Sequence, residues 1–299
     1  MHAISPLRTQ FDRLRRYCEE RADQACATLY RQLSNPSSIP AFNGEARFAF
    51  VTVNFSTSRW LALSLLTLSE QNALDRIANI VIVDNGSRDG GRLLIRELAT
   101  RIPRVTLIEN EHFLSHARGM RVGIDKLNEL DSRANVILSV DTDVIFLRPD
   151  TLKELTRIFE QGAAFAGEMR HGLYDIPEAQ ASLIAVRRDV YARKYIAPWV
   201  NHGAPSYWMQ KSIRRAGLLV HDFPSYRDGY ALHRGRSGVR AAKTFQTGGS
   251  YASIANDEPH FMGNPDGEAI WTTVEKRWSS LLEPYTRGAL IKELTTRLS

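Results

Sequence analysis

Short apolar runs and helical apolar patterns alternate along the central part of the chain. The β-rich apolar runs lie at 48–53, 80–83, 105–108 and 136–140. Each run is followed by a segment whose apolar side chains recur every three or four residues, which is typical of an amphipathic helix. Continuous apolar strands that alternate with helices form parallel sheets covered on both faces. The pattern therefore predicts an α/β fold with a mostly parallel central sheet.

Local residue types predict where the elements begin and end. Thr57 or Ser58 is expected to cap the first helix, because a side-chain oxygen there accepts a hydrogen bond from an amide of the first turn. The second helix stops at Pro103, and Pro149 opens the fourth. Further along we expect a strand at 182–190, a helix at 206–216, a strand at 218–220, a loop-rich stretch at 221–265 and helices from about 268.

Residues 4–34 carry apolar side chains at intervals of three and four, and several arginines lie off this stripe. Such a helix packs on the body of the protein or on a second copy of the chain, as in a homodimer. The alternative is a basic amphipathic helix that lies on the inner face of a membrane. Residues 35–40 (NPSSIP) form a linker, since prolines and serines do not continue a helix.

Composition places the chain among globular proteins. Of its 299 residues, 43% are hydrophobic and 24% are charged, which excludes disordered and low-complexity classes. No run approaches the roughly 18–20 apolar residues of a spanning helix. The N-terminus lacks the apolar stretch of a secretory signal, and two cysteines are too few for a disulfide scaffold. We therefore expect a cytoplasmic protein, with peripheral contact at the inner face of the membrane as an option.

The net charge of +6 favours an anionic ligand. Lys and Arg are scattered and no nucleic-acid-binding motif is present, so nucleic acid is not expected as a partner. A small molecule that carries phosphate fits this charge distribution better.

Polar residues follow the four predicted parallel strands, at the edge of the sheet where open parallel sheets bind ligands. These residues are Asn54, Asp84-Asn85, Glu109-Asn110 and Asp141-Thr142-Asp143. Neither a GxGxxG nor a GxxxxGK[ST] pattern is present, which disfavours a dinucleotide site and excludes the usual P-loop.

Asp141 and Asp143 directly follow the apolar run VILSV. Two carboxylates at the end of a buried strand are costly unless a cation compensates them. Oxygen ligands favour Mg²⁺ or Mn²⁺, which also bridge a diphosphate. The alternative is a pair of exposed turn aspartates, and the apolar residues that follow (VIFLRP) argue against it.

Four segments together resemble family 2 glycosyltransferases with the GT-A (nucleotide-sugar-binding) fold. They are VTVNFSTS (51–58), VIVDNGSRDGG (81–91), ENEHFLSHARGMRVGI (109–124) and ILSVDTDVIFLRP (137–149). The resemblance covers about 47–190 and implies three parts. These are an N-terminal helical extension with its linker at 1–46, a GT-A domain at 47–265 (nucleotide-binding half 47–163, acceptor half 164–265) and a C-terminal helical segment at 266–299.

The resemblance also implies roles for individual residues. Asn54, Asp84 and Asn85 would form the nucleoside pocket, Asp141 would lie near the ribose and the metal, and Asp143 would be the firmer metal ligand. His116 and Arg118 are either contacts to the donor sugar or phosphate, or ordinary residues of the helix surface. Arg121 stands where relatives commonly have Asn. The segment ALHRGRSG (231–238) resembles a late loop that supplies a metal-binding histidine, here His233, unless that side chain faces solvent. Arg234, Arg236 and Lys243 would meet the diphosphate.

The catalytic base departs from the family pattern. Inverting relatives carry an acidic pair at the start of the helix near Ser206, but no carboxylate occurs from Asn201 to Leu219. A group must take the proton of the attacking hydroxyl, and the candidates are Glu168, His202 and Asp222. A displaced base, a retaining mechanism assisted by the donor phosphate, and loss of activity all remain open.

The expected function is metal-dependent transfer of a sugar from a nucleoside-diphosphate sugar to a hydroxyl of a glycan or glycolipid acceptor, in synthesis of a bacterial surface polysaccharide or glycolipid. One alternative is a catalytically silent nucleotide-sugar-binding or assembly protein, which the missing acidic pair favours. A sugar-nucleotide pyrophosphorylase is a further alternative, although NFSTSRW lacks the Gly-rich basic loop of that class. The side chains of Tyr174, Trp199, Tyr207 and Trp208 either stack on an acceptor sugar or pack in the core.

Overall fold

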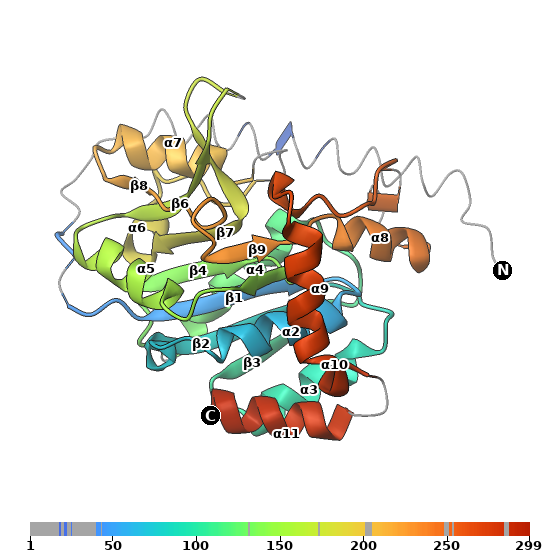
Figure 1. Ribbon diagram of the computed structural model, residues 1–299. Helices are drawn as coiled ribbons and strands as arrows, with labels where there is room; N and C mark the ends of the chain where they lie inside the picture. Colours follow the sequence, from blue (N-terminus) through green and yellow to red (C-terminus); the bar gives the residue numbers. More distant parts are fainter. Residues whose placement is uncertain are drawn as a thin grey trace.

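The computed structural model describes Cys18, Arg21, Ala22, Ala25 and residues 40–299 apart from 43, 131, 173, 201–204, 248–250, 253 and 284–286 (Figure 1). Most of the helix expected at 4–34 lies outside the described residues, and so does His202. The expected contact of residues 4–34 with a membrane or a second copy therefore stays a prediction.

A seven-stranded sheet forms the centre of the molecule, in the order β3-β2-β1-β4-β7-β6-β8 (Figure 1). The strands are β1 (Phe48–Asn54), β2 (Ile77–Asp84), β3 (Val105–Glu109), β4 (Val136–Val140), β6 (Phe165–Arg170), β7 (Glu178–Arg187) and β8 (Val220–Asp222). The strands β1 to β4 are parallel, and β6 and β8 run in the same direction. β7 is antiparallel to both of its neighbours, β4 and β6. The mostly parallel sheet predicted from the sequence is confirmed.

The central strand β1 shows why this sheet is covered on both sides. Its sequence is FAFVTVN, and every residue in it is buried. Phe48 and Phe50 enter one hydrophobic cluster, whereas Ala49, Val51 and Val53 enter a second one. Successive side chains of a strand point to opposite faces, so an uninterrupted apolar run needs a layer of helices on each face.

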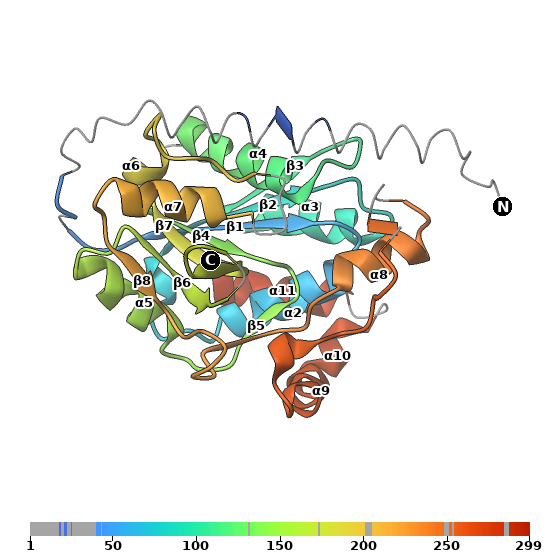
Figure 2. The same ribbon diagram turned by 90° about the horizontal axis from the view of Figure 1, so that it is seen from above.

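Helices supply both layers (Figure 2). One face is covered by α2 (Ser58–Leu68), α3 (Gly91–Arg101) and α5 (Thr151–Glu160), and the other by α4 (His116–Glu129), α6 (Arg188–Tyr191) and α7 (Tyr207–Arg215). A short 3₁₀ turn, η1 (Leu74–Arg76), precedes β2. Helix α4 lies unusually close to the sheet, because a Cβ at Gly119 would lie 2.9 Å from Val53 Cγ1 and a Cβ at Gly123 would lie 2.8 Å from Val51 Cγ1.

Two strands outside the main sheet correct the sequence prediction. β5 (Val144–Phe146) and β9 (Ala231–His233) form a separate antiparallel sheet, and α8 (Ser237–Thr244) follows β9. The stretch at 221–265, expected to be rich in loops, therefore contains the strand β9 and the helix α8. The sequence did not predict β9, because a strand of three residues is too short to show a periodic signal. The strand expected at 182–190 also ends earlier, since residues 188–191 form α6.

The C-terminal segment is helical, as expected, with η3 (Phe261–Gly263), α9 (Gly267–Arg277), α10 (Ser279–Leu282) and α11 (Arg287–Leu298). The ring of Trp271 in α9 contacts that of Trp60 in α2 at a centroid distance of 5.6 Å. Leu290 and Leu294 of α11 join the cluster that contains α3 (Figure 1). In the part of the chain described, no helix has the length and apolar character needed to cross a bilayer.

Candidate active site

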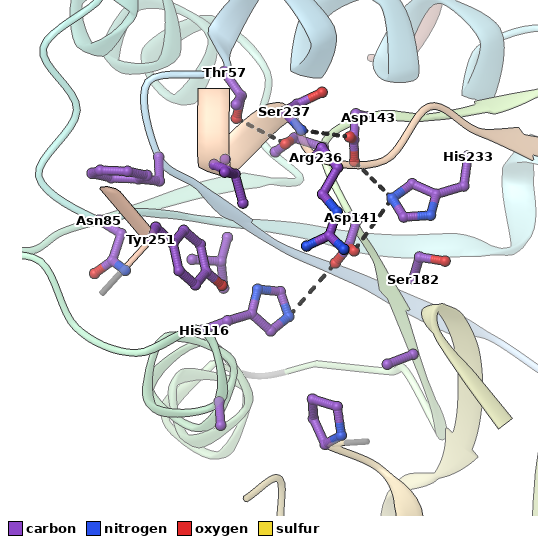
Figure 3. A pocket seen from close by; sticks show the side chains of 18 of the residues that line it. Thr57, Asn85, His116, Asp141, Asp143, Ser182, His233, Arg236, Ser237 and Tyr251 are labelled. Carbon is purple, nitrogen blue, oxygen red and sulfur yellow. Dashed lines mark hydrogen bonds and ion pairs between the residues drawn. The ribbon is translucent and has the colours of Figure 1, made fainter. Parts of the chain in front are cut away.

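A cavity of about 410 Å³ lies at the carboxyl ends of the parallel strands. The loops after β1, β2, β3 and β4 contribute Thr57, Asn85, His116 and the turn Asp141-Thr142-Asp143 to its lining (Figure 3). Its other walls come from β7 and from the region between β9 and η3, and they include Gln180, Ser182, His233, Arg236, Ser237, Tyr251, Ile254 and His260. The cavity therefore occupies the edge of the sheet where the sequence predicted a site.

Asp141, Asp143 and His233 converge in this cavity, with one ligand atom from each within 4.8 Å of the others. His233 Nε2 lies 3.1 Å from Asp143 Oδ1 and 3.8 Å from Asp141 Oδ2 (Figure 3). Pairing of β5 with β9 sets this geometry, because Val144 lies opposite His233 in the ladder. Two carboxylates and an imidazole suit Mn²⁺ and related divalent ions, so the residues present fit the expected metal.

The two carboxylates have different electrostatic surroundings. Burial acts to raise the pKa of Asp143, but the charge of His233 and hydrogen bonds from His233 and Ser237 outweigh it and hold the pKa well below its ordinary value. Burial raises the pKa of Asp141, and His116 and His233 only partly oppose that effect. Burial lowers the pKa of His233, yet both carboxylates raise it, and the net shift is upward. Asp143 is thus the firmly ionised member of the pair.

The start of α2 is tied to the metal-site turn by Thr57. Its Oγ1 contacts Asn54 Oδ1 at 3.1 Å and Thr142 Oγ1 at 2.8 Å, and it makes no capping hydrogen bond. Asp89 Oδ2 instead accepts the Ser58 N–H at 2.8 Å. Thr57 thus occupies the expected N-cap position of α2, but the expected side-chain hydrogen bond is absent, and the carboxylate of Asp89 accepts a first-turn amide instead.

The three residues expected around the nucleoside hold the loops together. Asp84 is fully buried, accepts a hydrogen bond from Asn54 Nδ2 at 3.1 Å and pairs with Arg92 Nε at 2.6 Å. Asn85 lines the cavity, and its side chain exchanges two hydrogen bonds with the backbone of Leu114. Asn54 and Asp84 do not line the cavity. Contact of these residues with a nucleoside stays a prediction.

Aromatic side chains line the same end of the cavity, and sequence reasoning missed them. Phe113 packs edge-on against Phe55 at 4.7 Å and against Tyr251 at 5.5 Å between ring centroids. Phe55 and Phe113 lie inside two of the motif segments, which could have drawn attention to them. Tyr251 comes from a part of the chain with no recognisable pattern.

Of the basic residues expected near a diphosphate, some line the cavity and others lie away from it. Arg236 lines the cavity and has a left-handed backbone, with φ of 64° (Figure 3). His116 also lines it, 3.6 Å from Asp141 Oδ1. Arg118 does not line the cavity. Arg234 is buried over the ring of Trp60, and Lys243 pairs with Asp257 at 2.6 Å.

Residues 50–216 match the family model described as "Glycosyl transferase family 2". The chain belongs to glycosyl transferase family 2. No curated protein matches its sequence. Among solved structures it is similar to the mannosyltransferase PcManGT from Pyrobaculum calidifontis, solved in complex with GDP-Man and Mn²⁺, with 14% identity and a TM-score of 0.50 over 95% of this chain and 97% of that chain.

Two further solved structures share less of the fold. TarS residues 1–349 from S. aureus shows 12% identity and a TM-score of 0.46 over 84% of this chain and 90% of that one. Glucosyl-3-phosphoglycerate synthase from Mycobacterium tuberculosis, solved with phosphoglyceric acid, shows 14% identity and a TM-score of 0.46 over 73% and 87%. Together with the family match, the likeness to PcManGT confirms the GT-A fold and the glycosyltransferase class predicted from the sequence.

In this family 2 glycosyltransferase, the two acidic candidates for the base are engaged elsewhere. Glu168 Oε2 accepts the N–H groups of Tyr226 and Arg227 at 2.5 and 3.0 Å. Asp222 Oδ1 accepts the Met169 N–H, and both oxygens of Asp222 accept from Arg227 Nη2 at 2.8 Å. Neither carboxylate lines the cavity. The positions of Glu168 and Asp222 therefore do not support the role of catalytic base that the sequence suggested for them.

Three of the four aromatic residues considered for the acceptor pack against one another, whereas the ring of Trp199 contacts that of His116 at 6.2 Å. Trp199 is fully buried, and Tyr207 lies between Tyr174 at 4.6 Å and Trp208 at 4.9 Å, measured between ring centroids. None of the four lines the cavity. The core alternative fits Trp199 best, because its whole side chain is removed from solvent.

Proposed function

We propose that this glycosyltransferase moves a sugar from a nucleoside-diphosphate sugar to a hydroxyl of an acceptor, and that the reaction needs Mn²⁺ or Mg²⁺. The observation that carries the proposal is the convergence of Asp141, Asp143 and His233 within 4.8 Å in the cavity. PcManGT, which has the same fold, was solved with GDP-Man and Mn²⁺, in agreement with this ligand class.

The cavity offers a separate surface for each part of the donor. When bound, the cation would neutralise charge on the diphosphate and make it a better leaving group. Arg236 and His116 line the same cavity and can donate hydrogen bonds to phosphate or sugar oxygens. Phe55, Phe113 and Tyr251 form an apolar aromatic end that suits the flat face of a nucleobase.

The acceptor enters from the β7 side in this proposal, where Gln180 and Ser182 line the cavity. The acceptor hydroxyl must lose a proton when it attacks the sugar. Of the three candidates from the sequence, we propose His202 as the base that takes this proton, because Glu168 and Asp222 do not line the cavity. From the resemblance of the four motif segments to family 2 glycosyltransferases, we further propose that the acceptor is a glycan or glycolipid. The reaction would then belong to the synthesis of a bacterial surface polysaccharide or glycolipid.

The metal assignment is tested by replacing Asp143 with Asn. Wild-type protein is screened against UDP-, GDP- and dTDP-sugars by thermal shift, because only a true ligand raises the melting temperature by mass action. The stabilisation is expected to require Mn²⁺, and Asp143→Asn should remove it and lower turnover by at least about 100-fold. Asp125→Asn, an exposed carboxylate on α4, is the matched control. Full metal-dependent turnover in Asp143→Asn would show that the assignment is wrong.

A further inference from the structure

One wall of the cavity comes from a part of the chain beyond the family match. The match ends at residue 216, whereas Tyr251, Ile254 and His260 all line the cavity. This wall is attached directly to the metal site, because the backbone N–H groups of His260 and Phe261 both donate to the carbonyl of Arg234 at 3.1 Å. Arg234 follows His233 in the chain, so the position of His260 is fixed relative to the metal ligands.

His260 is an exposed residue that lines the cavity, and one of its two ring nitrogens is engaged within the protein. Nδ1 accepts a hydrogen bond from the Met262 N–H at 3.1 Å, so the ring proton resides on Nε2. Nε2 has no hydrogen-bond partner among the residues that the structure describes. The ring packs edge-on against His233, with a centroid distance of 5.7 Å and an interplanar angle of 85°. An N–H donor that no described residue accepts therefore lies beside His233 of the candidate metal site.

The neighbouring backbone is shaped to admit this ring. Gly235 has φ of 77°, and a Cβ on it would lie 2.2 Å from His260 Nε2. Any side chain at this position would displace the imidazole, so the glycine is needed both for the turn and for the close approach. Arg236, the next residue, also has a left-handed φ and lines the same cavity. Glycine adopts this conformation without strain, whereas at Arg236 it is sparsely populated, and such positions cluster at sites that hold a ligand.

We propose that His260 is a phosphate-binding residue, which rests on the proposed function: its Nε2–H donates a hydrogen bond to the donor phosphate farther from the nucleoside, beside Arg236. The two aspartates would repel that phosphate, and N–H donors from neighbouring residues offset the repulsion. When the bond to the sugar breaks, negative charge grows on this phosphate. A fixed N–H donor stabilises the charge without transferring its proton.

Nucleotides that differ by one phosphate test this role. UDP against UMP, and GDP against GMP, are titrated calorimetrically into the full chain with Mn²⁺. His260→Ala should weaken diphosphate binding roughly tenfold or more, the value of a hydrogen bond to a charged group, and leave the monophosphate within about twofold. Gly235→Ala, which forces the ring away, should reproduce this pattern. His221→Ala on β8 removes a histidine that does not line the cavity and should change neither affinity.

Three results would overturn the inference. Equal losses for mono- and diphosphate would indicate a general structural effect, and no loss would exclude the contact. Weaker Mn²⁺ binding by His260→Ala without nucleotide, measured by electron paramagnetic resonance, would make His260 part of the metal site instead. If the wild-type chain binds none of the four nucleotides and does not bind dTDP either, the proposed function itself fails, and this inference fails with it.

Discussion

At the scale of single residues, the site depends on a few polar contacts that give similar side chains different tasks. Asp143 is 5% exposed and is surrounded by donors from His233 and Ser237, whereas the neighbouring Asp141 is open to the cavity. Glu168 is also buried, with 9% of its surface exposed, yet it accepts hydrogen bonds from two backbone amides and does not face the cavity. Burial of a carboxylate is therefore not a sign of catalysis in this protein, and the direction it faces decides its role.

The replacement of Glu168 by Gln is expected to affect stability and not chemistry. The neutral amide accepts the N–H groups of Tyr226 and Arg227 more weakly, so we expect a loss of about 1–2 kcal/mol in the free energy of unfolding. Urea denaturation followed by circular dichroism measures this loss in the free energy of unfolding. Turnover per folded molecule should stay within about twofold, whereas a base would lose roughly 100-fold. A loss of that size would return Glu168 to the list of bases.

The replacement of His202 by Ala is expected to have the opposite result. If this side chain takes the acceptor proton, kcat falls by about 100-fold or more while the affinity for the donor nucleotide stays unchanged. Steady-state transfer kinetics and calorimetry separate the two effects. Unchanged kcat would exclude His202 and favour assistance by the donor phosphate.

At the scale of elements, two glycines let α4 lie close to β1 of the sheet. Gly119 and Gly123 lie one turn apart on α4 and face Val53 and Val51 of β1. The same helix carries His116 at its start, so its distance from the sheet also places His116 at the cavity. Small residues on the buried face of α4 thus connect core packing with the geometry of the site.

Substitution of Gly123 by Ala is expected to destabilise the protein although alanine favours helices. The new methyl group would lie 2.8 Å from Val51 Cγ1 and 3.0 Å from Val83 Cγ2. Overpacking of this kind costs about 1–3 kcal/mol and exceeds the gain of about 1 kcal/mol in helix propensity. Gly288→Ala on α11, where nothing lies within 4 Å, is the control and should raise the melting temperature slightly. A higher melting temperature for Gly123→Ala would show that α4 shifts without cost.

At the scale of the whole molecule, the C-terminal segment links helix α2 with the wall of the cavity. Helix α9 packs Trp271 on Trp60 of α2, and Arg59 of α2 pairs with Glu275 at 2.8 Å. The segment before α9 carries His260 to the cavity wall. Docking of α9 on α2 therefore supports a residue of the site from a distance.

Truncation of Trp271 tests this connection. Trp271→Ala removes a side chain that is 3% exposed, and core substitutions of this size cost about 3–5 kcal/mol. Because α9 anchors the segment that holds His260, diphosphate affinity should fall as well, under conditions in which the variant stays folded. Thr272→Ala, on the exposed face of the same helix, should change neither property. Unaltered nucleotide affinity in a destabilised Trp271→Ala would separate the helix from the site.

Local pattern alone predicted most of the sheet and the position of the two aspartates of the candidate metal site. β1 to β4 appear within a few residues of their predicted limits, because uninterrupted apolar runs bounded by polar turns leave few alternatives. Asp141 and Asp143 follow β4 directly, so the strand itself places them at the edge of the sheet. The sequence shows that two carboxylates directly follow a buried apolar strand, and this arrangement is unfavourable unless a cation compensates the charges.

What only the tertiary structure decided is how partners from far away in the chain reach the site. The resemblance pointed to His233, but the ladder of three residue pairs that brings it to Asp143 is seen only in the structure, and so are the two hydrogen bonds to Arg234 that hold His260 at the cavity. Asn54 and Asp84 carry polar side chains at the right strand ends, yet both are turned into the protein. Periodicity reports which face a residue occupies within one element. It carries no information on pairing across 90 residues, because such contacts depend on how whole elements pack against one another.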